Sequence, residues 1–192
     1  MGTCGTKNIR KIKQQKLIGV RPIPNHILKV VNSQLEGSIC KIYINENELG
    51  TGFICKIPFP DEFRLLPVLI TNNHVINEEY CLKNKIIKIS FDDDRIIRLL
   101  KIFPERKLYS NRNYDISIIE IFPNKDKLNS FLELDYNYGK NEKEGKQNIY
   151  VLQYPKGNES CASYGNIKDI NEHEIEIHVQ QTSAVQVVRL YY

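Results

Sequence analysis

Short runs of Ile, Val, Leu, Phe and Tyr, separated by clusters of Asn, Asp, Gly and Pro, recur along most of the chain. Apolar runs of about four to eight residues with turn-forming residues between them are typical of β-strands. We predict strands over 38–44, 50–57, 66–71, 85–91, 95–103, 115–122, 148–153, 160–164 and 174–180. Because many short strands follow one another without βαβ alternation or a repeat, the pattern favours an all-β barrel or sandwich.

One segment before the strands has a different period. Apolar residues at 27, 28, 31 and 35 have the spacing of a helix face, so we predict a short helix over 26–35. The segment before it is polar and basic, and residues 137–147 are rich in Asn, Gly, Lys and Glu. The predicted organisation is a flexible basic arm (1–25), a first β-barrel (26–136), a linker (137–147) and a partial second β-barrel (148–192).

The net charge of +4 is unevenly distributed. Residues 1–35 carry seven basic side chains and no acidic one, and the rest of the chain holds 20 basic and 23 acidic side chains. The positive charge therefore belongs to the N-terminal arm, and such arms attract anionic lipid or nucleic acid. No basic surface interleaved with aromatic residues follows the arm, so we expect no nucleic-acid partner.

The first six residues fit a lipidation pattern. Gly2 follows Met1 and Thr6 completes the N-myristoylation motif, Cys4 is available for palmitoylation, and basic residues come next. Two such signals together make a stable anchor, whereas a single acyl chain binds a membrane only marginally. We predict a myristoylated, membrane-associated lipoprotein. The alternative is a solvated arm whose Gly2 has no such role.

The five cysteines limit the chemistry. They form no C-x-x-C pair, so zinc-ligand spacing is absent, and we predict no metal and no cofactor. Cys40 and Cys55 lie in strand-like apolar runs, where a buried free thiol is the usual finding. Free thiols and the lack of a secretory signal favour a cytoplasmic location, with membrane association through the arm.

Two residues at strand margins point to catalytic chemistry. The apolar run 66–71 ends in a short polar turn that contains His74, and Asp115 begins the run 115–122. A serine hydroxyl attacks an amide only if a base accepts its proton, and an imidazole held by a carboxylate suits that task. His74 followed by Asp115 has the order of the first two members of a His–Asp–Ser triad. The alternative is a surface-loop histidine beside a strand-edge carboxylate.

Several motifs in order give a family resemblance. The segments are Gly50-x-Gly52-Phe53, Leu69-Ile70-Thr71-Asn72-Asn73-His74-Val75, Tyr114-Asp115-Ile116-Ser117-Ile118-Ile119, and Tyr154-Pro155-x-Gly157 with Gly165 and the run from His178 to Thr182. Over residues 36–183 the chain resembles the trypsin-like serine proteases, nearest to the glutamyl endopeptidase branch. The resemblance implies a chymotrypsin-like double β-barrel, a peptide or protein substrate, His74 as general base and Asp115 as its orienting partner. It also implies that His178 and Thr182 contact the substrate.

The third member of the triad is not evident. The family needs a Gly-x-Ser-Gly loop whose backbone N–H groups stabilise the oxyanion, but Ser183 lacks the flanking glycines and is not assigned as nucleophile. Cys161 also lacks a Gly-x-Cys-Gly frame and reads as a strand residue. His26 and His173 fit neither motif.

A frame shift near the C-terminus would explain the missing loop. One permitted coding of residues 185–192, read two bases further on, gives Ser-Gly-Gly-Ser-Pro-Ile-Leu, which resembles the nucleophile loop of the family. We therefore expect a serine-type endopeptidase domain whose 192-residue sequence is inactive because it lacks the nucleophile loop. The alternative is a non-catalytic barrel of the same fold, acting as a membrane-tethered binding module.

Overall fold

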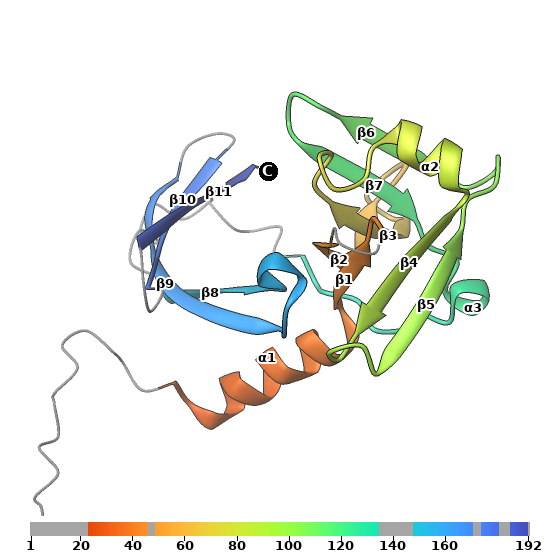
Figure 1. The fold of residues 1–192 in the computed structure, drawn as a ribbon. Helices are drawn as coiled ribbons and strands as arrows, with labels where there is room; N and C mark the ends of the chain where they lie inside the picture. The colour runs from red at the N-terminus through yellow and green to blue at the C-terminus, as the bar shows by residue number, and fades with distance from the viewer. Residues whose placement is uncertain (1–22, 46–48, 135–147, 171–173, 181–184, 192) are drawn as a thin grey trace, which may run out of the picture.

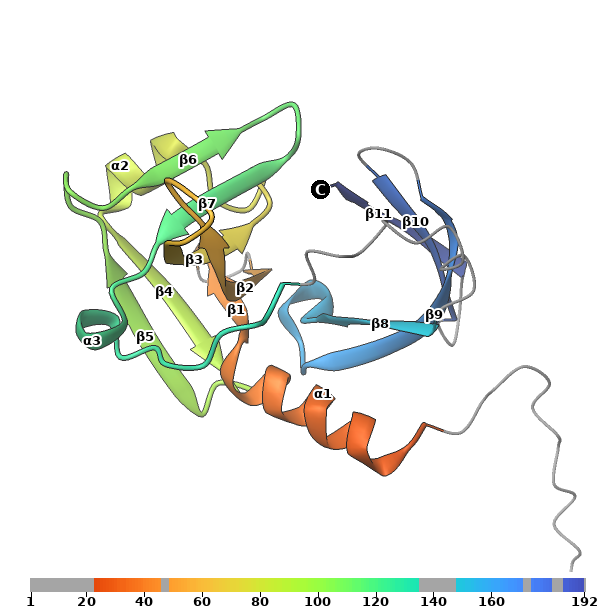
Figure 2. The same ribbon diagram turned by 180° about the vertical axis from the view of Figure 1, so that it is seen from behind.

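The computed structural model describes residues 23–45, 49–134, 148–170, 174–180 and 185–191, and these are predominantly β. Two antiparallel sheets lie side by side, and helix α1 (Asn25–Gly37) runs along the end of both (Figures 1 and 2). The predicted all-β class is confirmed at this level. The predicted helix over 26–35 corresponds to α1.

The first sheet has seven strands in the order β5-β4-β1-β2-β3-β7-β6. They are β1 (Ile39–Tyr43), β2 (Leu49–Pro58), β3 (Leu65–Thr71), β4 (Ile86–Phe91), β5 (Ile96–Lys101), β6 (Leu108–Asn111) and β7 (Ile116–Glu120). The sheet curls, and its two outer strands, β5 and β6, are consecutive in the chain. The connection between them is hydrogen-bonded to the sheet at both ends, from Ile102 N to Lys85 O at 2.7 Å and from Glu120 N to Lys107 O at 2.9 Å.

The core lies inside this curl. Its fully buried side chains include Ile42, Ile54, Leu69, Ile76, Ile87, Ile89, Phe91, Leu100 and Ile119. Gly50 on β2 makes room for Val75, because a Cβ atom at Gly50 would lie 2.3 Å from Val75 Cγ1. Close packing at this point fixes the backbone next to His74.

The second sheet has four strands in the order β11-β10-β9-β8. They are β8 (Asn148–Gln153), β9 (Cys161–Ile170), β10 (Glu174–Gln180) and β11 (Val185–Tyr191). The two sheets are tied together where β8 leads into β9. The hydroxyl of Thr51 accepts from the backbone of Tyr154 at 3.0 Å, and the carboxylate of Asp93 accepts from the backbone of Ser160 at 2.7 Å.

The structure adds elements that the sequence pattern did not predict. Besides β6 and β11, these are α2 (Glu78–Asn84), α3 (Pro123–Asp126) and a 3₁₀ turn over Pro155–Gly157. The side-chain oxygen of Asn77 caps α2 by accepting from Tyr80 N at 2.8 Å. β6, α2, α3 and the 3₁₀ turn are short, so each carries too few periodic positions to stand out in the sequence.

Some predictions fall outside the described residues. The predictions for nearly all of the basic arm, including Gly2 and Cys4, and for the linker 137–147 lie outside the described residues. Within the residues described, none of the helices has the length and apolar character needed to cross a bilayer.

A buried lysine pairs with an exposed aspartate across the first sheet. Lys41 on β1 is 5% exposed, and its Nζ lies 2.7 Å from Oδ2 of Asp94, which follows β4. The hydroxyl groups of Tyr43 and Ser90 donate to the same carboxylate. Desolvation acts to raise the pKa of Asp94, but these hydrogen bonds and the lysine charge outweigh it and lower the pKa to about 2.

We expect Asp94→Asn to destabilise the fold near neutral pH by about 1 kcal/mol, allowing for solvent screening of the exposed carboxylate. The lowered pKa means that the contribution is complete above the unfolded value of about 3.9 and is lost as pH falls through about 2. Urea denaturation of both proteins across this pH range measures the difference. Asp61→Asn, in an exposed pair with Arg64, is the control. An Asp94 effect that stays constant down to pH 2 would contradict the assignment.

Candidate functional site

His74 lies on a turn whose next two residues are buried in the core. β3 ends at Thr71, and the backbone N–H groups of Val75 and Ile76 donate to Asn72 O at 3.1 and 3.2 Å. Val75 and Ile76 are buried, whereas 71% of the His74 side chain is exposed. The two apolar neighbours therefore anchor the turn and leave the imidazole at the surface.

Asp115 comes from a second turn, between β6 and β7. Its backbone N–H donates to Arg112 O at 3.3 Å, and its φ of 49° is left-handed. Aspartate tolerates this conformation better than most residues with a Cβ atom. Antiparallel pairing of β3 with β7, with Thr71 opposite Ser117, brings the two turns together although His74 and Asp115 are far apart in the sequence.

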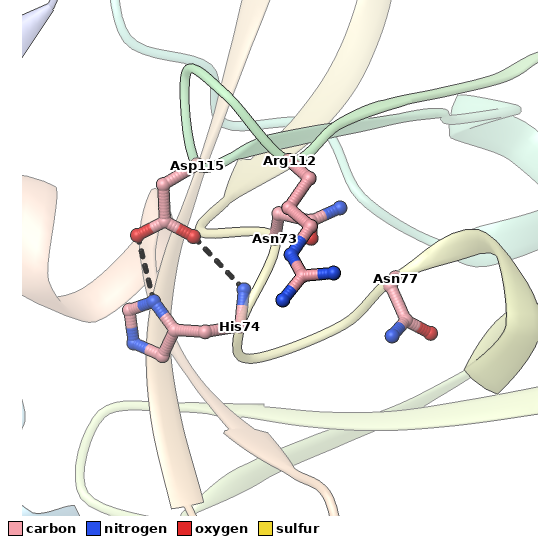
Figure 3. Close-up of a pocket in the computed structure, with 5 residues that line it drawn as sticks. All are labelled: Asn73, His74, Asn77, Arg112 and Asp115. Atoms are coloured by element: carbon pink, nitrogen blue, oxygen red, sulfur yellow. Dashed lines mark hydrogen bonds and ion pairs between the residues drawn. The ribbon is translucent and has the colours of Figure 1, made fainter.

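The carboxylate of Asp115 contacts both the ring and the backbone of His74 (Figure 3). His74 Nδ1 lies 2.7 Å from Asp115 Oδ2, and the backbone N–H of His74 donates to Asp115 Oδ1 at 2.9 Å. The side-chain amide of Asn72 also donates to Asp115 Oδ2, at 3.2 Å. These contacts fix the ring orientation, and a proton on Nδ1 leaves the lone pair on Nε2.

The electrostatics of the pair favour an ionised carboxylate. Partial burial acts to raise the pKa of Asp115, but hydrogen bonds from the backbone and ring of His74, with a smaller one from Asn72, outweigh it. The pKa of Asp115 is thus held below its ordinary value. A charged Asp115 stabilises a protonated imidazole, which is the state a general base reaches after it accepts a proton.

A pocket of about 480 Å³ lies beside the pair. Its lining residues are Asn73, His74, Asn77, Arg112 and Asp115 (Figure 3). They come from the turn after β3, the start of α2 and the turn before β7. All of the lining residues have polar side chains.

The other predicted site residues are placed as follows. His178 lies in β10, opposite Asn166 of β9 and Val187 of β11. Thr182 lies outside the described residues, as does Ser183. The structure therefore brings together His74 and Asp115.

None of the four cysteines that the structure describes lines this pocket. Cys40 and Cys55 are buried and free, as predicted, and burial raises the pKa of the Cys55 thiol to about 11. Cys161 begins β9 and lines a separate depression of about 650 Å³ together with Lys41. Among the described residues, no group of three or more His, Cys, Asp and Glu side chains could hold a metal ion.

Several residues of the site were not predicted from the sequence, among them Asn72 and Arg112. Asn72 lay inside the histidine motif, but its bond to Asp115 depends on the turn geometry. Arg112 shares a four-residue turn with Asp115, and only the fold places its side chain in the pocket.

Searches found no protein-family model and no curated protein that match this chain. The function must therefore be inferred from its residues and their geometry.

Proposed function

We propose that this protein is a serine-type endopeptidase domain that resembles the trypsin-like family. In this proposal His74 is the general base and Asp115 orients it. The two sheets correspond to the first barrel and to a partial second barrel of a chymotrypsin-like fold. The observation that supports it most is the double contact between His74 and Asp115, at 2.7 Å to the ring and 2.9 Å to the backbone.

The geometry suits proton transfer at a single atom. Asp115 holds Nδ1, so the opposite ring nitrogen, Nε2, is the one that can accept the proton of an attacking hydroxyl. The imidazole is exposed and lines a pocket, so a peptide can reach it. As the proton arrives, the ionised Asp115 stabilises the imidazolium that forms.

The attacking hydroxyl is the missing part. Among the residues the structure describes, no hydroxyl or thiol forms a hydrogen bond with the His74 ring. The sequence after Thr182 has no Gly-x-Ser-Gly loop. Hydrolysis requires that loop, and the alternative reading frame proposed above would supply it.

We expect the 192-residue chain to show no hydrolysis of a peptide ester. The product translated in the alternative frame after residue 184, here called the alternative-frame product, should react covalently with a fluorophosphonate probe. His74→Ala in that product should reduce labelling by at least about 10³-fold, because the serine loses its base. Labelling is followed by mass spectrometry, with His26→Ala as the matched control.

Cleavage by the 192-residue chain that His74→Ala abolishes would refute its expected inactivity and show that the nucleophile lies elsewhere in the chain. A different result would overturn the proposed serine itself. A transcript without a Ser-Gly-x-Ser-Pro string in the alternative frame would remove the proposed serine, and a non-catalytic binding module would then be favoured.

A further inference from the structure

Two groups of exposed apolar side chains lie on the first sheet, outside the pocket beside His74. One lies on the loop between β2 and β3, which joins the end of β3 that is farther from His74. The other lies on β4 and β5, and β1 separates these strands from β2 in the sheet. Apolar side chains that gather at a protein surface commonly mark a contact with another molecule.

The loop between β2 and β3 presents its apolar side chains from a hydrogen-bonded backbone. Its exposed apolar residues, here called the hairpin tip, are Phe59, Phe63 and Leu65. Phe63 is 87% exposed, although its backbone N–H donates to Asp61 Oδ1 at 3.1 Å. The backbone N–H of Phe59 donates to Arg64 O at 2.8 Å. An aromatic side chain that an ordered loop holds out in solvent suits the anchor of an interface.

The second group lies on the face of β4 and β5 that points away from the core. Its exposed apolar residues, here called the sheet face, are Ile86, Ile97 and Leu99. The strand register places Lys88 opposite Leu99 and Lys101 opposite Ile86, so two exposed lysines alternate with the apolar side chains. β5 lies on the side of the first sheet away from the second sheet (Figures 1 and 2). The sheet face is therefore open to solvent.

The hairpin tip and the sheet face carry opposite charges. β4 and β5 contain basic residues and no acidic one, and the described ion pairs include neither Lys88 nor Lys101. In the loop, Asp61 pairs with Arg64, which leaves the exposed Glu62 outside the described ion pairs. Two hairpin tips or two sheet faces would repel each other, whereas a tip attracts a face. The matching surface for each group is thus found on another copy of the same chain.

We propose that the hairpin tip of one copy of this chain packs on the sheet face of a second copy, with Glu62 beside Lys88 and Lys101. Because the contact joins two different surfaces, a pair of copies keeps one free tip and one free face. Association then continues into chains or rings and does not stop at a twofold dimer. Neither surface includes a residue that lines the pocket at His74, so the inference does not depend on the proposed function.

Sedimentation velocity of the full 192-residue chain measures this association directly. Because the two surfaces are small, we expect a dissociation constant on the order of 10 to 100 µM. The weight-average sedimentation coefficient should rise with chain concentration to values above that of a dimer. The rise should shrink at high ionic strength, because salt screens the attraction between Glu62 and the lysines.

Two variants separate the tip from the face. Phe63→Ser removes the tip, Leu99→Thr removes the centre of the face, and each variant alone should stay monomeric. An equimolar mixture of the two should form a dimer that grows no further, since one intact face then meets one intact tip. Glu62→Lys should weaken association of the otherwise unchanged chain about fivefold. The matched control is Tyr109→Thr, which removes an exposed side chain on β6 outside both groups and should leave association unchanged.

The mixture also guards against misfolded variants, because two unfolded chains would not restore a defined dimer. A chain that stays monomeric up to about 300 µM would overturn the proposal. A dimer that persists in Phe63→Ser would also overturn it, because two sheet faces would then pair with each other, and a mixture that stays monomeric would do the same. A monomeric chain that binds phosphatidylserine vesicles, and loses that binding in Leu99→Thr, would assign the sheet face to a membrane surface instead.

Discussion

Replacing Arg106 with methionine should lower the free energy of unfolding by about 3–5 kcal/mol. Arg106 is buried, and its guanidinium donates to both oxygens of Asp126 at 2.9 Å and to Glu120 O at 2.6 Å. The variant leaves the Asp126 carboxylate, with 5% of its side chain exposed, without its counter-charge. Loss of one partner is costly because the remaining charge stays buried.

The double variant Arg106→Met with Asp126→Leu should recover much of that loss, because no charge is then left buried. Equilibrium urea denaturation of the two single variants and the double variant measures the coupling. Arg64→Met is the matched control, since Arg64 pairs with Asp61 at the surface and its loss should cost less than about 0.5 kcal/mol. Equal losses at Arg106 and Arg64 would contradict the importance of the buried pair.

Asp115→Asn should reduce peptide hydrolysis by the alternative-frame product about 10³- to 10⁴-fold, by analogy with the orienting aspartate of the protease triad. An asparagine can present its NH₂ group to Nδ1, which favours the tautomer with the proton on Nε2, where it cannot accept one from the serine. The measurement is kcat/KM with a peptide ester over a range of pH.

Asp61→Asn is the matched control, because it changes the same group in the exposed β2–β3 loop. The folded variant should keep its circular dichroism spectrum, so that a loss of rate is not a loss of structure. A rate within about tenfold of the unsubstituted protein would reject Asp115 as the orienting residue.

Most of the strands could be predicted because their interior faces are apolar and their ends are marked by turn residues. The predicted strand 50–57 corresponds to β2 (Leu49–Pro58), and the predicted strand 85–91 corresponds to β4 (Ile86–Phe91). β6 escaped prediction because Leu108–Asn111 has a single aliphatic residue and depends on its pairing with β7. β11 escaped because residues 185–191 were interpreted as a frame-shifted reading, whereas Val185, Val187 and Leu190 fit a strand paired with β10.

The site was predictable to the extent that its residues lie at strand ends. His74 follows the C-terminal end of β3, and Asp115 precedes the N-terminal end of β7, so the antiparallel pairing places both at one edge of the sheet. Their positions at strand ends could be inferred from the hydrophobic pattern. The contribution of Asn72 and Arg112 depends on turns, including a left-handed φ at Asp115, which no periodicity reveals. The role of His178 and Thr182, by contrast, stays a prediction.

The described hydrogen bonds to the side chains of His74 and Asp115 all originate within residues 72–115 of the first sheet. In the proposed function, the base is therefore positioned before any nucleophile or substrate arrives, and none of its described hydrogen bonds comes from β8 to β11. Exchange of the C-terminal half would then supply different attacking groups to one unchanged proton acceptor.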